Sequence, residues 1–265
     1  MSTTRRAALV LGLLLAGAAG AEDTRRSGVD FMSPALQALQ RDDAQNPGML
    51  WVQDGQQLWN SPAGASGKRC ADCHGDAASS MAGVAARYPA WDTPMAGGPD
   101  GPGGPGGALN LAGRINACRQ RHQQAPALPP EHADLLALSA YVGLQSRGLP
   151  LRPPDDGRLA ALRQQGQTLW QQRIGQLNLA CAQCHDQRAG QRLGGATIPQ
   201  GHATGYPSYR LEWQGLGSLQ RRLRGCVVGV RAEPWGADDP EWLALEAWLA
   251  QRAAGMAMEI PAVRP

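Results

Sequence analysis

Four of the six cysteines lie in two short motifs, each of which ends in a histidine. The motifs are Cys70-Ala71-Asp72-Cys73-His74 and Cys181-Ala182-Gln183-Cys184-His185. The C-x-x-C-H pattern is typical of covalent attachment of haem c, in which both cysteines form thioethers and the histidine binds iron. Zinc and redox-dithiol sites are less favoured, because the two pairs lie far apart in the sequence and little strand pattern surrounds them. The motifs therefore predict two covalently bound haem c groups.

Two further cysteines, Cys118 and Cys226, follow the two motifs at similar distances. In a class I cytochrome c this region supplies the axial methionine, so the matching positions indicate two axial thiolates. The expected iron ligands are His74 with Cys118 in the first half and His185 with Cys226 in the second. A disulfide between Cys118 and Cys226 is the alternative. Weaker ligand candidates, which lack a matching residue in the other half or follow the last helix, are Met81, Met95, Met256, Met258, His122, His132 and His202.

Arginines surround both of these thiols. Positive charge favours the thiolate over the thiol, and the planar fork of arginine binds oxyanions through two hydrogen bonds. A thiolate ligand also lowers the reduction potential of a haem, which suits sulfur chemistry better than simple electron carriage. Charge alone does not distinguish the two sites, and a solvated basic turn is the alternative interpretation of the second. The arginines are Arg221, Arg222, Arg224 and Arg231 near Cys226, and Arg114, Arg119 and Arg121 near Cys118.

The segments around the two motifs recur in the same register. Gly55–Trp59 precedes the first motif as Gly166–Trp170 precedes the second, and the apolar runs 135–142 and 242–249 follow at helical spacing. An opening helix, a haem motif, an irregular middle and a closing helix resemble the class I cytochrome c fold, present twice. The expected fold is therefore mainly α, with two such domains in tandem, each around a covalent haem. The resemblance implies that Gly55 and Gly166 meet an aromatic residue of the closing helix, with Tyr141 and Trp248 as the partners.

The N-terminus is typical of an exported protein. Arg5 and Arg6 precede the apolar run Ala7–Gly20, which is too short to span a membrane and ends in a small-residue cleavage site. No other stretch is apolar enough to cross a bilayer, and a formal net charge of +3 leaves no footprint for nucleic acid. We expect a periplasmic protein that consists of a signal peptide (1–21), an N-terminal cytochrome c domain (22–149), a linker (150–157) and a C-terminal cytochrome c domain (158–265).

Three further segments resemble the SoxA family of the thiosulfate-oxidising Sox system, in its dihaem form. The segments are Gly83–Pro89, Arg114–Arg119, and Ser218–Cys226 followed by Val230–Pro234. The resemblance implies an L-cysteine S-thiosulfotransferase that pairs with the monohaem cytochrome SoxX and joins thiosulfate to a cysteine of the carrier SoxYZ. Electrons would pass through haem to a cytochrome c acceptor. It also implies that Cys226 is the catalytic cysteine, found as a persulfide, and that Arg222 binds the substrate.

Two other functions remain open at this point. A thiosulfate dehydrogenase that forms tetrathionate has similar parts, including a cysteine-ligated haem. A plain dihaem electron-transfer cytochrome would have no activity on sulfur compounds. A gas-binding sensor is disfavoured, because two thiolates would fill the position that such a ligand needs. The segment 97–107, rich in Gly and Pro, departs from the family and is expected to be a surface loop.

Overall fold

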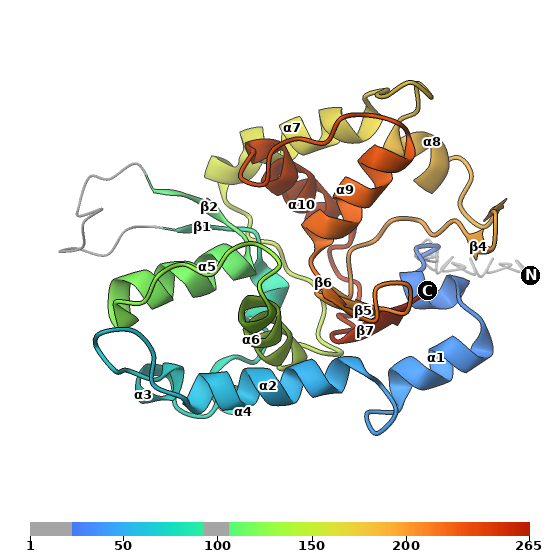
Figure 1. Cartoon of the computed structure of the whole chain (residues 1–265). Helices are drawn as coiled ribbons and strands as arrows, with labels where there is room; N and C mark the ends of the chain where they lie inside the picture. The colour runs from blue at the N-terminus through green and yellow to red at the C-terminus, as the bar shows by residue number, and fades with distance from the viewer. Residues whose placement is uncertain (1–22, 93–105) are drawn as a thin grey trace, which may run out of the picture.

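The computed structural model describes residues 23–92 and 106–265. The predicted signal peptide, Met95 and most of the predicted loop 97–107 lie outside these ranges. The described chain is mainly helical, and its short strands form three small sheets. Two helix pairs lie on either side of a small central sheet, as Figure 1 shows. Within the described ranges, no helix has the length and apolar character needed to cross a bilayer.

The first helix pair consists of α2 (Gly48–Asn60) and α6 (Ala133–Leu144). The side chain of Asn46 accepts a hydrogen bond from the amide of Gly48 at 2.9 Å and so satisfies a free amide at the start of α2. The helices cross at Gly55, where an added Cβ would lie 2.2 Å from the carbonyl oxygen of Ala137 and 2.7 Å from Cβ of Tyr141. Only glycine allows the two backbones to approach this closely. The predicted contact between Gly55 and Tyr141 is confirmed.

The second helix pair repeats this arrangement with α7 (Ala160–Gln171) and α10 (Pro240–Arg252). An added Cβ at Gly166 would lie 2.0 Å from the carbonyl oxygen of Ala244 and 2.8 Å from Cβ of Trp248. Asp156 caps a short 3-10 helix that leads into α7, and Pro240 occupies the first turn of α10. The contact of Gly166 with Trp248 agrees with the sequence prediction.

Each repeat also contains an antiparallel strand pair that leads into a helix bearing one of the two further cysteines. In the first repeat β1 (Ala90–Asp92) pairs with β2 (Gly107–Leu109), and α5 (Leu111–Cys118) follows. In the second repeat β5 (Ser208–Arg210) pairs with β6 (Gly215–Gly217), and α9 (Leu219–Gly229) follows. Asn110 and Ser218 cap α5 and α9 with their side chains. The remaining elements are α1 (Pro34–Arg41), α3 (Cys70–His74), α4 (Ala77–Ser80), α8 (Cys181–His185), β3 (Arg192–Leu193), β4 (Ala196–Thr197), β7 (Ala262–Arg264), the 3-10 helices η1 (Gly28–Phe31), η2 (Ala85–Arg87) and η4 (Gly157–Leu159), and the π-helix η3 (Arg119–Gln123).

The central sheet joins the two repeats. Strand β7 pairs in parallel with β5, which gives the strand order β6-β5-β7. Leu216 of β6 is 2% exposed and packs in one apolar cluster with Val52 and Leu136 of the first repeat. Burial of these side chains stabilises the contact by roughly 2 kcal/mol for each large aliphatic residue.

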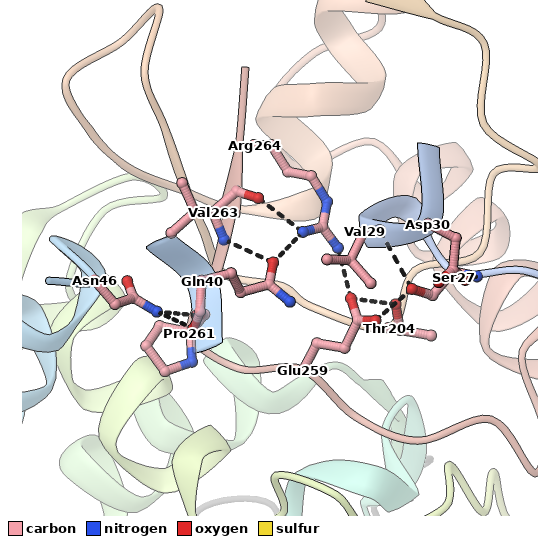
Figure 2. Close-up of polar contacts among 10 residues, drawn as sticks. All are labelled: Ser27, Val29, Asp30, Gln40, Asn46, Thr204, Glu259, Pro261, Val263 and Arg264. Atoms are coloured by element: carbon pink, nitrogen blue, oxygen red, sulfur yellow. Dashed lines mark hydrogen bonds and ion pairs between the residues drawn. The ribbon is translucent and has the colours of Figure 1, made fainter. Parts of the chain in front are cut away.

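A polar network ties the N-terminal segment to the last strand, and Figure 2 shows how these side chains point toward one another. Gln40 of α1 accepts a hydrogen bond from the amide of Val263 at 3.1 Å. Arg264 pairs with Glu259 at 2.6 Å, and Asn46 donates to the carbonyl oxygen of Pro261 at 2.9 Å. The ends of the described chain are therefore held beside the central sheet.

Candidate functional site

Each C-x-x-C-H motif forms a single helical turn directly beneath a buried tryptophan. The Trp59 ring lies 5.6 Å from the His74 ring, and the Trp170 ring lies 5.5 Å from the His185 ring. One turn of helix brings both thiols and the imidazole of a motif to the same end of its repeat. In each repeat the predicted attachment cysteines therefore lie close to the histidine of their own motif. These cysteines are Cys70 and Cys73 in the first repeat and Cys181 and Cys184 in the second.

His185 is held by its surroundings. Its Nδ1 atom lies 2.7 Å from the carbonyl oxygen of Pro199, so Nδ1 carries the proton and donates it to this bond. Nε2 is then the nitrogen that can bind a metal, and the hydrogen bond fixes the plane of the ring. His74 is exposed, and burial of part of its ring lowers its pKa.

Cys226 of α9 lies opposite His185, and the two side chains are in hydrogen-bonding contact. Burial alone would raise the pKa of the Cys226 thiol. The hydrogen bond between Cys226 and His185 and the charges of Arg222 and Arg210 outweigh burial and hold the pKa below its usual value. The second repeat thus brings together the predicted residues His185, Cys226 and Arg222, and it adds Arg210, which sequence reasoning missed.

Cys118 of α5 occupies the matching position in the first repeat. It lies close enough to Cys70 and Cys73 for their charges to affect one another. Burial raises the pKa of the Cys118 thiol, and the opposing effects of Arg114 and Arg121 do not overcome it. The two thiols therefore have matching positions and opposite electrostatic surroundings.

The donor set fits a haem c in each repeat. Two thiols and an imidazole share one turn, a further thiol faces them from the cysteine-bearing helix, and a tryptophan packs against the imidazole. All six cysteines are unpaired, so the alternative of a disulfide between Cys118 and Cys226 is wrong. Within residues 23–92 and 106–265, no three His, Cys, Asp or Glu side chains gather as a zinc site requires.

The weaker ligand candidates have other contacts. Met81 packs against the apolar core of the first repeat, and His132 caps α6 by accepting a hydrogen bond from the amide of Asp134 at 3.2 Å. Burial lowers the pKa of His202 to about 4. His202 lines a cavity of about 310 Å³ beside His185, together with Arg252.

The surroundings of the two thiols follow one pattern that sequence reasoning missed. In each repeat a Tyr-Pro pair precedes the first strand: Tyr88 lies near Cys118, and Tyr206 lies near Cys226. The last residue of that strand is Asp92 in the first repeat and Arg210 in the second, and each pairs in register with a glycine. The recurrence of the Tyr-Pro pair at positions 88–89 and 206–207 was the signal available in the sequence.

The arginine four residues before each thiol has a different environment in the two repeats. Asp92 is buried and forms ion pairs with Arg114 and Arg121, the latter at 2.6 Å. These two arginines lower the pKa of the Asp92 carboxyl. In contrast, the half-buried guanidinium of Arg222 has no hydrogen-bond or ion-pair partner among the described residues.

A buried carboxyl lies between the two cysteine-bearing helices. Glu246 of α10 accepts a hydrogen bond from the Asn110 side chain at 3.1 Å and contacts the amide of Gln220. Asn110 caps α5, and Gln220 lies in the first turn of α9. Burial raises the pKa of Glu246 to about 7. This residue therefore links the starts of both helices.

Comparison with known proteins agrees with this geometry. Residues 54–151 and 165–258 match the family described as SoxA/TsdA, cytochrome c domain. The L-cysteine S-thiosulfotransferase subunit SoxA of Pseudaminobacter salicylatoxidans is 37% identical over 91% of this chain and 82% of that protein. The SoxA subunit of Rhodovulum sulfidophilum is 36% identical over 91% of this chain and 81% of that protein. The crystal structure of SoxXA from P. pantotrophus matches with a TM-score of 0.83 and 32% identity, and covers 91% of this chain and 87% of that chain. The predicted tandem of cytochrome c domains is confirmed, and such domains bind haem c.

Proposed function

The chain belongs to the SoxA family of L-cysteine S-thiosulfotransferase subunits, and from this premise we propose that Cys226 is its catalytic residue. In this proposal the protein joins thiosulfate oxidatively to a cysteine of the carrier SoxYZ. Arg222 binds the thiosulfate anion, and the reaction takes place in the second repeat. The observation that carries the assignment is the Arg222 guanidinium, which acts on the Cys226 thiol and has no hydrogen-bond or ion-pair partner in the part of the chain that the structure describes.

Charge is the first obstacle that the site must overcome. Thiosulfate is a dianion and the attacking sulfur is a thiolate, so the two reactants repel each other. The Arg222 guanidinium, which has no partner among the described residues, is free to donate two parallel hydrogen bonds to the sulfonate oxygens. In the first repeat the corresponding Arg114 already binds Asp92. This contrast supports placing catalysis at Cys226 and not at Cys118.

The reaction balances as two steps. The Cys226 thiolate and the outer sulfur of thiosulfate form one S–S bond with loss of two electrons. The carrier thiolate then attacks the sulfur attached to Cys226, and the Cys226 thiolate leaves. The product is the carrier cysteine bearing the sulfur and the sulfonate, and the carrier thiol has given up one proton. Haem c, when bound, supplies one-electron acceptors for the two electrons.

We further propose two haem c groups. Cys70 and Cys73 would hold the first, whose iron is ligated by His74 and Cys118. Cys181 and Cys184 would hold the second, whose iron is ligated by His185 and Cys226. Each repeat contains one set of residues that suits a haem c, and this supports two haem groups in the protein.

The proposed partners are supported by the family, and the proposed compartment is supported by the N-terminal sequence. A monohaem cytochrome of the SoxX type would form a heterodimer with this chain, as in the SoxXA structure that it matches. SoxYZ would be the carrier, and a cytochrome c would take the electrons. Export to the periplasm rests on the predicted signal peptide 1–21, which lies outside the described residues.

The experiment that tests this function compares Cys226→Ser with Cys118→Ser. Each variant is purified with SoxX and mixed with thiosulfate, SoxYZ and an oxidised cytochrome c, and conjugated carrier is measured by mass spectrometry. We expect Cys226→Ser to retain covalent haem and to lose conjugation, while Cys118→Ser retains it.

Three results would contradict the proposal. Conjugation at the normal rate by Cys226→Ser would remove this cysteine from the chemistry. Formation of tetrathionate without any need for SoxYZ would identify a thiosulfate dehydrogenase. No activity with thiosulfate in either assay would leave a plain electron-transfer cytochrome as the better account.

A further inference from the structure

We propose that Arg210 is a second anion-binding residue of the Cys226 site and that, with Arg222, it holds the sulfonate group of thiosulfate. This inference rests on the proposed function and adds a substrate-binding residue to it. The position of Arg210 is the one that Asp92 occupies in the first repeat. The first repeat has a carboxylate at this position and the second has a guanidinium. In this proposal that difference allows the second site, and not the first, to bind an external anion.

The equivalence of these two positions rests on the backbone. Asp92 ends β1 and pairs in register with Gly107, while Arg210 ends β5 and pairs in register with Gly215. Each strand follows a Tyr-Pro pair with a cis peptide bond. Each strand pair leads directly into a capped helix whose eighth residue is Cys118 or Cys226. Asp92 and Arg210 therefore occupy equivalent positions on equivalent strands.

The two equivalent positions carry opposite charges, negative at Asp92 and positive at Arg210. Asp92 is 8% exposed and binds both Arg114 and Arg121, so the first site carries its own internal anion. At the second site Arg210, which is 9% exposed, holds the position of Asp92, and Arg222 holds the position of Arg114, its ion-pair partner in the first repeat. Where the first repeat pairs a carboxylate with a guanidinium, the second has guanidinium groups at both positions, and this arrangement favours a bound anion.

The local contacts of Arg210 leave part of its fork available. Its Nε atom donates to Glu212 at 2.9 Å, and its guanidinium lies 5.1 Å from the Trp213 ring. These contacts fix the direction of the side chain. Neither Nη atom has a hydrogen-bond partner among the described residues. Glu212 is about half exposed, so its negative charge is screened by water and offsets only part of the Arg210 charge.

The anion recognised by this pair has two possible sources. One is the sulfonate of thiosulfate, and the other is a propionate of the haem. Both are anionic groups with several oxygen acceptors, and an arginine fork suits either. A propionate contact predicts that loss of Arg210 changes haem loading or the reduction potential. A thiosulfate contact predicts weaker binding of thiosulfate with both properties unchanged.

The experiment measures thiosulfate binding to the oxidised holoprotein by calorimetry, together with KM and kcat in the conjugation assay. The variants are Arg210→Gln and Arg210→Lys, and the matched control is Arg173→Gln. Arg173 is an exposed arginine of the same repeat whose Nε also has a partner, the carbonyl oxygen of Asn178 at 2.8 Å. We expect binding to weaken roughly tenfold or more for Arg210→Gln, since a hydrogen bond to a charged group is lost. Arg210→Lys should restore part of the loss, and Arg173→Gln should have no effect.

A second variant tests the role of Arg210 without removing a buried side chain, so that a failure to fold cannot explain the result. Glu212→Gln removes the exposed partner of Arg210 and leaves the buried side chain in place, so we expect thiosulfate to bind roughly twofold to fivefold more tightly. Covalent haem content and the reduction potential are measured for every variant.

The possible results separate this inference from the proposed function. Weaker binding by Arg222→Gln with normal binding by Arg210→Gln would overturn the role of Arg210 and leave the function standing. A changed reduction potential or haem content with an unchanged KM would assign Arg210 to the haem propionate. No binding or conjugation of thiosulfate by the unmodified protein would overturn both.

Discussion

Replacement of Gly166 by alanine tests how closely helices α7 and α10 approach each other at their crossing. The new Cβ would lie 2.0 Å from the carbonyl oxygen of Ala244, whereas ordinary contact begins at 3.4 Å. Helices α7 and α10 must therefore separate by more than about 1 Å. Overpacking of this kind costs about 1–3 kcal/mol or more, and the better helix propensity of alanine offsets about 1 kcal/mol. Because the clash is with backbone and not with a flexible side chain, we take the upper end of this cost, about 3 kcal/mol, and expect a net loss of about 2 kcal/mol.

The assay is thermal and denaturant unfolding of the holoprotein, followed by circular dichroism. A loss of about 2 kcal/mol corresponds to a decrease in Tm of roughly 4–8 °C for a protein of this size. The control is Gly157→Ala, which precedes the same helix, because an added Cβ there meets nothing within 4 Å. Its stability should change by less than about 1 kcal/mol. Equal stability of Gly166→Ala and the unmodified protein would refute the close crossing.

Two further predictions concern the buried carboxyl and the thiolate ligands. Because burial raises the pKa of Glu246 from 4.5 to about 7, the folded state keeps a proton that the unfolded chain releases. The stabilisation from the protonated Glu246 should therefore be fully present below about pH 4.5, and the free energy of unfolding should fall by about 3 kcal/mol as the pH rises through 7. Glu246→Gln should remove this pH dependence in denaturant titrations. An unchanged pH dependence in that variant would show that another group titrates. Electron paramagnetic resonance of the oxidised protein should show two low-spin histidine-thiolate signals, of which Cys118→Ser removes one and Cys226→Ser the other. Histidine-methionine or bis-histidine signals would show that these cysteines do not bind iron.

The sequence was sufficient to predict the repeated helices and the cysteine-bearing segments. C-x-x-C-H has one dominant chemical use, and the matching spacing of Gly55 and Gly166 identified the helix crossings that the structure contains. The repeated helices depend on local periodicity, which is visible in a single sequence. Arg222 and Cys226 were assigned by the family resemblance, and helix α9, on which a spacing of four residues puts them on one face, lies where an irregular middle was expected.

The charge difference between the two sites could not be predicted in this way. Asp92 and Arg210 lie on short strands far from their cysteines in the sequence, and the segments between the paired strands differ in length in the two repeats. The strands are also too short to show alternation of apolar and polar residues. Only the register of each strand pair brings the two positions into correspondence. Glu246 was missed for a similar reason, since its burial depends on contact between the repeats.

The most direct test of the account is to locate the sulfur that thiosulfate leaves on the protein. The oxidised holoprotein with SoxX is incubated with thiosulfate in the absence of SoxYZ, digested without reductant, and examined by peptide mass spectrometry. The account predicts a sulfur adduct on the peptide that contains Cys226, which disappears when SoxYZ is added, and no adduct on the peptide that contains Cys118. An adduct on Cys118, or conjugation of the carrier at the full rate with no adduct on Cys226, would contradict it.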